Sequence, residues 1–287
     1  MRVKNYSVSA LNSFRSCPLQ FYLSYVERIR TPSSAEAFVG NTVHSTVHSM
    51  NTDLAGGRVP NLLEMLSRFH KSWDDRWETE SVVIFRDGVQ QDSYRSTGER
   101  CVKFYHAHHR DLMMGETVVA EERIYTKLGP DAIPFVVVPD RISRVVELGV
   151  PGEYVVHDYK TKAKPPSGYD LRNDRQLPLY ETALREKWPD ARRVKLAWHY
   201  LALEQSYEVT RERVEREAVI KSLLDDVAAA EAATEFPPRP SPLCHWCMYW
   251  EKCPAQKFRK REVVDHRPVA DGPAVTRAEP ETPDAGN

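Results

Sequence analysis

Long apolar runs are missing from this sequence of 287 residues. No stretch of 18 or more apolar residues occurs, which excludes a membrane-spanning helix. The first residues, MRVKNYSVSALNSF, also lack the continuous apolar stretch of a secretory signal. We therefore expect a cytoplasmic protein with reduced thiols and no membrane partner. An excess of positive charge is missing too: the formal net charge is −1, so nucleic-acid binding would depend on local basic patches.

What is present is an ordinary globular composition, 41% hydrophobic and 28% charged, over a length that suits one large or two small domains. Helical spacing of apolar residues predicts a helical region over 7–29, with Ser9 as N-cap and an interruption at Pro18. The remaining expected helices cover 37–50, 61–77, 97–114, 171–188 and 210–235. Three strand-like runs predict an antiparallel meander over 117–128, 133–148 and 153–162, and a later strand is expected over 192–203.

Acidic residues stand in the second and third strand-like runs. Asp140 follows an apolar run near the middle of its predicted strand, and Asp158 and Lys160 share one face of theirs because side chains alternate. Two carboxylates facing each other across a hairpin repel unless a cation lies between them, and Mg²⁺ prefers such ligands. Lys160 could then neutralise phosphate charge or orient water. The alternative is a solvated Asp–Lys pair on a wet sheet face, which the apolar neighbours disfavour.

These residues resemble the signature of the PD-(D/E)XK nuclease superfamily. Asp140 precedes Asp158-Tyr159-Lys160, and DYKTK is similar to the corresponding stretch of RecB-family nucleases. The sequence QLPLY, with Gln176 and Tyr180, resembles the Q-x-x-x-Y motif of that family, and GNTVH resembles its G-x-x-x-H motif. Each motif is weak alone, but together, in this order, they are specific.

The resemblance implies an α/β (α+β) fold with a restriction-endonuclease-like mixed sheet flanked by helices. It implies one nuclease domain over residues 1–260, and composition predicts a disordered Pro- and acid-rich tail over 261–287. Mg²⁺ or Mn²⁺ would be held by His44, Asp140, Asp158 and the backbone carbonyl of Tyr159. Lys160 would stabilise charge or position water, and Gln176 and Tyr180 would contact the DNA backbone or brace the site.

This sequence departs from the family pattern near the first acidic motif and after the lysine. Val137 stands where glycine is usual, Ser143 where a second acid is usual, and Lys162 where glycine is frequent. None of these changes removes an expected metal ligand, so activity is expected to survive.

The sequence HSTVH has the spacing of two zinc-binding histidines on a helix. The metalloprotease pattern requires glutamate after the first histidine, and Ser45 stands there, so we reject that reading. We expect His48 to be a packed or surface residue. Glu121 and Glu122 could add a carboxylate to the site, although a solvated strand face is the favoured interpretation.

Four of the five cysteines form a pattern of one early and three late residues, Cys17, Cys244, Cys247 and Cys253. In a reduced compartment such a set indicates a metal site, either a 4Fe-4S cluster or a structural Zn²⁺. The pattern is similar to iron–sulfur RecB-type nucleases, the AddB nuclease domains and CRISPR-associated RecB-like nucleases. Such a cluster would staple the two ends of the domain together. Cys101 has no partner in this pattern and is expected to be a packed helix residue.

The function implied by the resemblance is a metal-dependent DNA exonuclease that acts on DNA ends or single strands. Recombination, repair or CRISPR-like DNA processing would be its setting, with a protein partner in a recombination or CRISPR complex. No G-x-x-x-x-G-K-[ST] P-loop occurs, so we expect no fused helicase. The alternative is a non-catalytic DNA-binding or assembly factor with a structural metal cluster.

Overall fold

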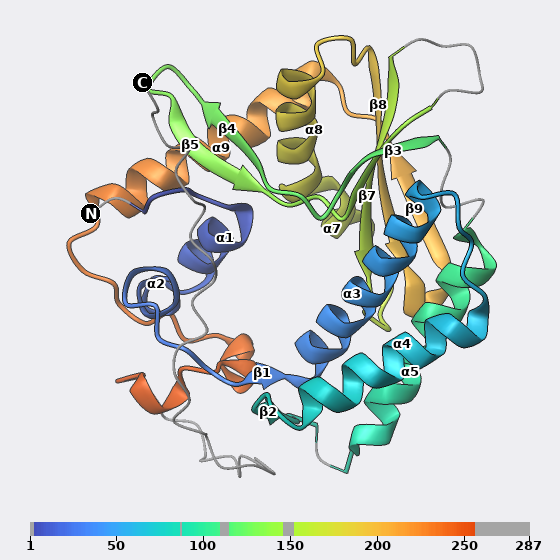
Figure 1. Cartoon of the computed structure of the whole chain (residues 1–287). Helices are drawn as coiled ribbons and strands as arrows, with labels where there is room; N and C mark the ends of the chain where they lie inside the picture. Colours follow the sequence, from blue (N-terminus) through green and yellow to red (C-terminus); the bar gives the residue numbers. More distant parts are fainter. Residues whose placement is uncertain (1–2, 87, 110–114, 146–151, 256–287) are drawn as a thin grey trace, which may run out of the picture.

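A five-stranded mixed sheet forms the centre of the computed structural model, which describes residues 3–86, 88–109, 115–145 and 152–255 (Figure 1). In spatial order its strands are β3 (Glu116–Ala120), β6 (Arg141–Arg144), β7 (Glu153–Lys160), β8 (Arg193–Tyr200) and β9 (Gln205–Val209). Neighbouring strands are antiparallel except β7 and β8, which are parallel. A parallel pair needs a crossover, and α8 (Gln176–Lys187) provides it.

Strand β7 is the central strand, and its first seven residues are all buried. Alternation sends Tyr154, Val156 and Asp158 to one face of the sheet, where α8 packs. Tyr159 points to the other face and belongs to a second core, formed with three helices. The strand is therefore covered on both faces, although its sequence, EYVVHDYK, includes Glu153, His157 and Asp158 among the buried residues.

The second core is formed by a layer of helices, α3 (Ala35–Ala55), α4 (Leu62–Trp77) and α5 (Gln91–Ala107). Figure 1 shows them on the side of the sheet away from α8. Gly98 allows α5 to approach α4 closely, because a Cβ there would lie 2.4 Å from the Phe69 ring. Cys101 is fully buried on α5, which confirms the prediction that it is a packed helix residue.

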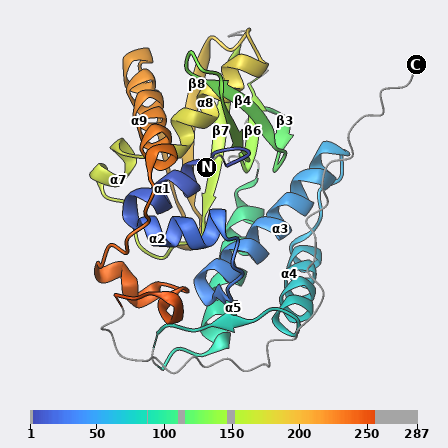
Figure 2. The ribbon, with the colours of Figure 1, turned by 90° about the vertical axis from the view of Figure 1, so that its left-hand side faces the viewer.

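The N-terminal helices pack beside the C-terminal part of the described chain (Figure 1, Figure 2). The elements are α1 (Val8–Ser16), α2 (Pro18–Phe21), a π-helical turn (Tyr22–Val26), α9 (Arg213–Ala232) and two 3₁₀ turns (Pro242–Trp246 and Trp250–Lys252). Helix α1 contacts α9, and the Tyr249 hydroxyl bonds to Ser24 at 2.7 Å and to the Ile29 carbonyl at 3.2 Å. The N-cap of α1 is Ser7, not Ser9 as expected, because the Ser7 side chain accepts from the Ala10 N–H.

The predicted meander is wrong in its connections. The first run breaks at Glu121, whose φ of +51° ends β3, and the second run breaks around Asp140. The inner halves, β4 (Ile124–Leu128) and β5 (Ile133–Val137), pair with each other as a separate hairpin outside the central sheet. Asp140 therefore lies between β5 and β6 and not in the middle of a strand.

Other boundaries also differ from expectation. The helix expected over 171–188 is two helices, α7 (Gly168–Arg172) and α8, and strand β9 was not expected. Two short strands, β1 (Ser33–Ser34) and β2 (Val82–Val83), pair in parallel. Strand β1 comes just before α3 in the chain, and β2 comes just after α4. The tail predicted over 261–287 lies outside the described residues. Among helices in the described ranges, none combines the length and apolar character that a membrane crossing requires.

Candidate active site

The expected site residues meet where β7 ends. Asp158 and Lys160 are among the last three residues of that strand. Gln176 and Tyr180 lie at the start of α8, and His44 lies on α3. Helix α3 runs close to the strand end, since a Cβ on Gly40 would lie 3.5 Å from the Thr161 hydroxyl oxygen. The glycine and histidine of the G-x-x-x-H motif thus lie one turn apart on the helix that faces this end of β7.

Asp140 and His44 are joined through the backbone of Tyr159. The Tyr159 N–H donates to Asp140 Oδ2 at 2.6 Å, and His44 Nε2 lies 2.9 Å from the Tyr159 carbonyl oxygen. The other ring nitrogen of His44 lies 3.2 Å from Asp140 Oδ1. The backbone of Tyr159 therefore faces the site, while its ring packs in the second core.

Asp158 is the most buried member of the site, with 1% of its surface exposed. Its Oδ2 lies 2.6 Å from the Lys160 ammonium, which is its cationic partner. Its Oδ1 accepts a 3.3 Å bond from the Gln176 amide. A buried carboxylate is costly unless it is paired, and Lys160 and Gln176 supply that pairing here.

Gln176 and Tyr180 form a brace between α8 and the segment that carries Asp140. The Gln176 amide donates to the Tyr180 hydroxyl at 2.6 Å, and that hydroxyl donates to the Val138 carbonyl at 3.0 Å. Tyr180 is 7% exposed. Of the two interpretations offered by the motif, this geometry favours bracing over direct contact with a substrate backbone.

Mutual charges and burial set the protonation of the site. Burial raises the pKa of Asp158 to about 7, and Asp140 adds to the rise, while Lys160 opposes it. Burial alone would lower the pKa of His44, but the hydrogen bond and charge of Asp140, with Glu121 and Asp158, raise it to about 9. Both of its ring nitrogens then donate, which matches its two acceptor neighbours. Binding a metal would require this imidazole to lose a proton.

The donor chemistry fits a hard divalent cation. The carboxylates of Asp140 and Asp158 and the Tyr159 carbonyl are oxygen ligands of the kind that Mg²⁺ and Mn²⁺ prefer, whereas the His44 imidazole is more typical of softer transition metals. Within the described residues, however, no group of three or more His, Cys, Asp or Glu side chains is spaced to hold a metal ion. The expected ligands instead contact their neighbours, Lys160 on Asp158 and the Tyr159 N–H on Asp140.

Two further carboxylates also lie here: Glu121, for which the sequence favoured a solvated strand face, and Asp174, which the sequence analysis did not single out. Glu121 is half-buried just after β3, with Oε1 4.0 Å from His44 Nδ1, which favours the alternative that it adds a carboxylate to the site, whereas Glu122 is exposed. Burial raises the pKa of its carboxyl, while His48 and His44 lower it. Asp174 precedes α8 and accepts from the Leu177 N–H at 2.8 Å; burial raises its pKa, and Lys160 is among the groups that lower it. Two features of the sequence could have indicated these residues: Glu121 directly follows a strand, and Asp174 lies just before a helix.

The four cysteines of the pattern are half-buried free thiols. Burial raises the pKa of Cys247, and Cys17, Cys244 and Cys253 raise it further, so the structure brings one early and three late cysteines within electrostatic reach. Backbone N–H groups donate to two of the sulfurs, Arg239 to Cys17 at 3.4 Å and Ser241 to Cys244 at 3.3 Å. A four-cysteine metal cluster is not shown, because no metal-binding group occurs in the described part of the chain.

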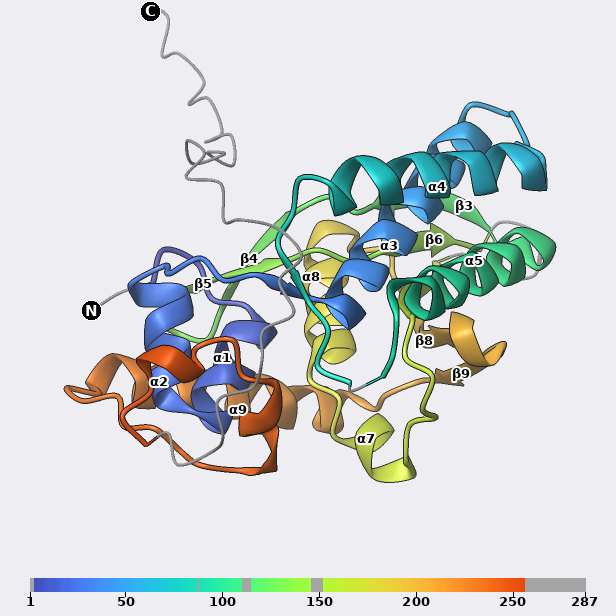
Figure 3. The same ribbon diagram turned by 90° about the horizontal axis from the view of Figure 1, so that it is seen from below.

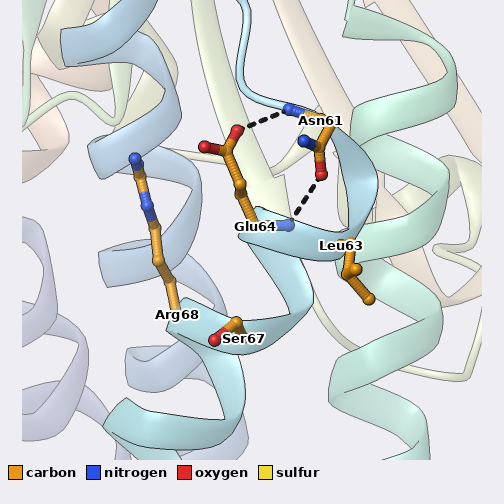
Figure 4. Close-up of a pocket in the computed structure, with 5 residues that line it drawn as sticks. All are labelled: Asn61, Leu63, Glu64, Ser67 and Arg68. Carbon is orange, nitrogen blue, oxygen red and sulfur yellow. Dashed lines mark hydrogen bonds between the residues drawn. The ribbon is translucent and has the colours of Figure 1, made fainter.

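A surface hollow at the start of α4 is separate from these residues. It is lined by Asn61, Leu63, Glu64, Ser67 and Arg68 (Figure 4). Asn61 and Glu64 cap the helix reciprocally, with bonds of 2.9 and 2.8 Å, so the N–H groups of these two residues are already used. None of the expected site residues lines this hollow.

Comparisons with known proteins bear on the family and on the fold. The sequence model of the PD-(D/E)XK nuclease superfamily matches residues 5–254. Among solved structures, a candidate exonuclease from Eubacterium rectale matches with 13% identity and a TM-score of 0.53, over 90% of both chains. At that identity the likeness shows the fold alone, and the mixed sheet with flanking helices fits a restriction-endonuclease-like fold.

A second solved structure, of the protein SSO0001, matches with 14% identity and a TM-score of 0.35, over 87% of this chain and 96% of that one. This TM-score is too low to establish a shared fold. No significant relative was found among proteins with curated descriptions.

Proposed function

The chain belongs to the PD-(D/E)XK nuclease superfamily, and from that premise we propose that it is a metal-dependent DNA exonuclease acting on DNA ends or single strands. One observation carries the proposal: Asp140 and Asp158 converge on the end of β7, beside the Lys160 ammonium and the Tyr159 carbonyl. A non-catalytic DNA-binding factor would have no need for two neighbouring acids, one of them buried beside a lysine, at the end of the central strand.

In this proposal His44, Asp140, Asp158 and the Tyr159 carbonyl would hold Mg²⁺ or Mn²⁺. When bound there, the ion would supply Lewis-acid polarisation of the phosphoryl group and a more acidic water. The water oxygen forms a bond to phosphorus, the bridging P–O bond breaks, and the departing sugar oxygen takes up a proton. Lys160, held by Asp158, faces the negative charge that develops on the phosphoryl oxygens.

Gln176 and Tyr180 act in this proposal as positioning residues. Tyr180 holds the Val138 carbonyl, two residues before Asp140, and Gln176 holds Asp158. These bonds fix the positions of Asp158 and of the segment that carries Asp140, so the brace keeps the two carboxylates at a constant separation.

The finer placement is a RecB-type nuclease, similar to AddB nuclease domains and CRISPR-associated nucleases, with a 4Fe-4S cluster on Cys17, Cys244, Cys247 and Cys253. Their electrostatic proximity and the N–H groups aimed at two sulfurs support a metal centre. Structural Zn²⁺ is the alternative. A visible absorption spectrum of anaerobically purified protein, with iron, sulfide and zinc analysis, distinguishes the two, and absence of all three would contradict both.

The test of the function is cleavage of end-labelled single-stranded and duplex DNA with Mg²⁺, Mn²⁺ or a chelator. We expect metal-dependent shortening by the wild type and a loss of about 10²–10³-fold in rate for Lys160→Ala. Lys71→Ala is the matched control, since its side chain is 76% exposed on α4. Equal degradation by wild type and Lys160→Ala would overturn the proposed site.

A further inference from the structure

The segment that follows Lys160 leaves the sheet and remains on the surface. Residues 162–165 are exposed, and the short helix α7 adds exposed Tyr169 and Arg172. Figure 3 shows α7 at the periphery, joined to the rest of the ribbon by two loops. Tyr169 is 68% exposed, which places a large aromatic ring in water.

This exposed ring is carried by backbone that is firmly held. Ser167 and Asp170 form a capping box, with bonds of 2.8 and 3.1 Å. The Asn173 amide donates to the Tyr169 carbonyl at 2.8 Å. From the far side of α7, Arg211 donates to the Leu171 carbonyl at 2.7 Å and to the Arg172 carbonyl at 3.1 Å. The exposure of Tyr169 is therefore a property of an ordered turn.

The turn lies within electrostatic reach of the acidic site. Burial raises the pKa of Tyr200, Lys160 lowers it, and Asp158, Asp170 and Asp174 raise it, so α7 and the end of β7 act on the same hydroxyl. Arg211, which holds α7, also acts on Asp174 together with Lys160. The segment also begins at the residue after Lys160, and Lys160 lies opposite Tyr200 in the pairing of β7 with β8, so the segment adjoins the acidic site.

The charge of the segment is positive. Residues 161–173 contain the cations Lys162, Lys164 and Arg172 against one carboxylate, Asp170, which is bonded to Ser167. Lys162 stands where the resembled family often has glycine, so this cation is a feature of the present chain. An apolar partner would have to desolvate three cations here, whereas a phosphate backbone would be attracted to them.

Building on the proposed function, we propose that residues 161–172 form a platform for a single strand of DNA next to the cutting site. The ring of Tyr169 stacks on an unpaired base, and Lys162, Lys164 and Arg172 hold the flanking phosphates. A base-stacking ring beside cations is the arrangement by which single strands are bound without sequence preference. In a duplex the bases are already stacked on one another, so the platform favours single strands and frayed ends.

The test is fluorescence anisotropy with a labelled oligo-dT strand and a blunt duplex of the same length, in chelator so that no cleavage occurs. We expect Tyr169→Ala to weaken oligo-dT binding by about tenfold, within the range of base–aromatic stacking. Tyr169→Phe should bind as the wild type, and blunt-duplex binding should change less than twofold. Tyr125→Ala is the matched control, because that tyrosine is 56% exposed on β4.

The cations are tested by salt dependence. Lys162→Ala/Lys164→Ala should weaken oligo-dT binding and reduce the slope of log K against log salt by about 1.4, since each single-strand phosphate contact adds about 0.7. Lys221→Ala, with a 76% exposed side chain on α9, should leave the slope unchanged. Tyr169→Ala binding as well as Tyr125→Ala, or an unchanged slope in the double variant, would overturn the platform.

Failure of the platform and failure of the nuclease proposal remain distinguishable. If Lys160→Ala abolishes cleavage while Tyr169→Ala binds and cuts like the wild type, the platform alone is wrong. If no metal-dependent cleavage occurs but Tyr169→Ala still weakens oligo-dT binding, the platform stands and the nuclease proposal is wrong.

Discussion

The two faces of strand β7 differ in how their buried polar side chains are paired. On the α8 face, the buried Asp158 forms an ion pair with Lys160 at 2.6 Å. On the opposite face, Glu153 pairs with Lys195 at the start of the strand, and His157 and Tyr159 are buried among neutral partners. The two sets alternate along the same strand, so their difference comes from what packs on each face.

The opposite face is completed by its own neighbours. Ser143 Oγ lies 2.9 Å from His157 Nε2, His157 Nδ1 lies 2.9 Å from His199 Nε2, and His199 Nδ1 lies 2.8 Å from Ser206 Oγ. This chain of bonds runs across β6, β7, β8 and β9. Burial holds the pKa of His157 well below its ordinary value and lowers that of His199 to about 4, so both rings are neutral. Hydrogen bonds between neutral groups hold the histidines on this face, whereas the α8 face carries an ion pair beside the second carboxylate, Asp140.

The largest effect is expected from removing the charge on the α8 face. Asp158→Asn should lower the rate of metal-dependent DNA cleavage by about 10²–10³-fold, because a proposed metal ligand is lost. Any fall in melting temperature would report the lost ion pair with Lys160, so cleavage is compared at a temperature at which both proteins are folded. Asp225→Asn, 62% exposed on α9, is the control. Undiminished cleavage by Asp158→Asn would remove Asp158 from the proposed ligand set.

The next effect concerns acid stability on the histidine face. The folded-state pKa of His199, about 4, lies below its ordinary value of 6.5, so the unfolded chain binds the proton more readily. Its contribution to stability is complete above pH 6.5 and is lost as the pH falls toward 4, by up to about 3 kcal/mol.

Chemical unfolding of wild type and His199→Gln between pH 7.5 and 4.5 measures this loss. The variant should be less stable at neutral pH but lose less stability on acidification. His108→Gln, at an exposed histidine, is the matched control and should follow the wild type. If the unfolding free energies of wild type and His199→Gln fell in parallel with pH, the interpretation that His157 and His199 are a neutral pair would be contradicted.

The smallest effect should come from Tyr159, whose backbone faces the acidic site while its hydroxyl lies on the other face. That hydroxyl lies 3.4 Å from the Tyr105 hydroxyl, which donates to Asn51 at 2.6 Å. Tyr159→Phe should cost about 0.5–1 kcal/mol of unfolding free energy and leave cleavage within about twofold, because the backbone of this residue, and not its hydroxyl, bonds to Asp140 and His44. A large loss of cleavage with unchanged stability would show that the two faces are coupled.

Some features of the site were readable from sequence because they are local. The alternation of a strand places Asp158 and Lys160 together, and the structure joins them at 2.6 Å. The i, i+4 spacing of Gln176 and Tyr180 on a helix likewise gives their mutual hydrogen bond. The glycine-to-histidine spacing on α3 needs only one turn of helix.

Other features depended on contacts between distant segments. Glu121 was assigned to a wet strand face, because nothing near it in the sequence shows that β3 ends there in a left-handed residue beside His44. The β4–β5 hairpin and the edge strand β9 were likewise missed, since strand pairing is decided by partners and not by periodicity.

The sequence by itself determined the side-chain directions along β7, the face shared by Gln176 and Tyr180, and the motif order that places the chain in its superfamily. Only the tertiary structure decided that the backbone of Tyr159 joins His44 to Asp140, that Asp140 lies in a break, and that Cys17 approaches three cysteines more than 220 residues later. The physical reason is that periodicity is fixed by backbone geometry within a few residues, whereas these meetings depend on how whole elements pack.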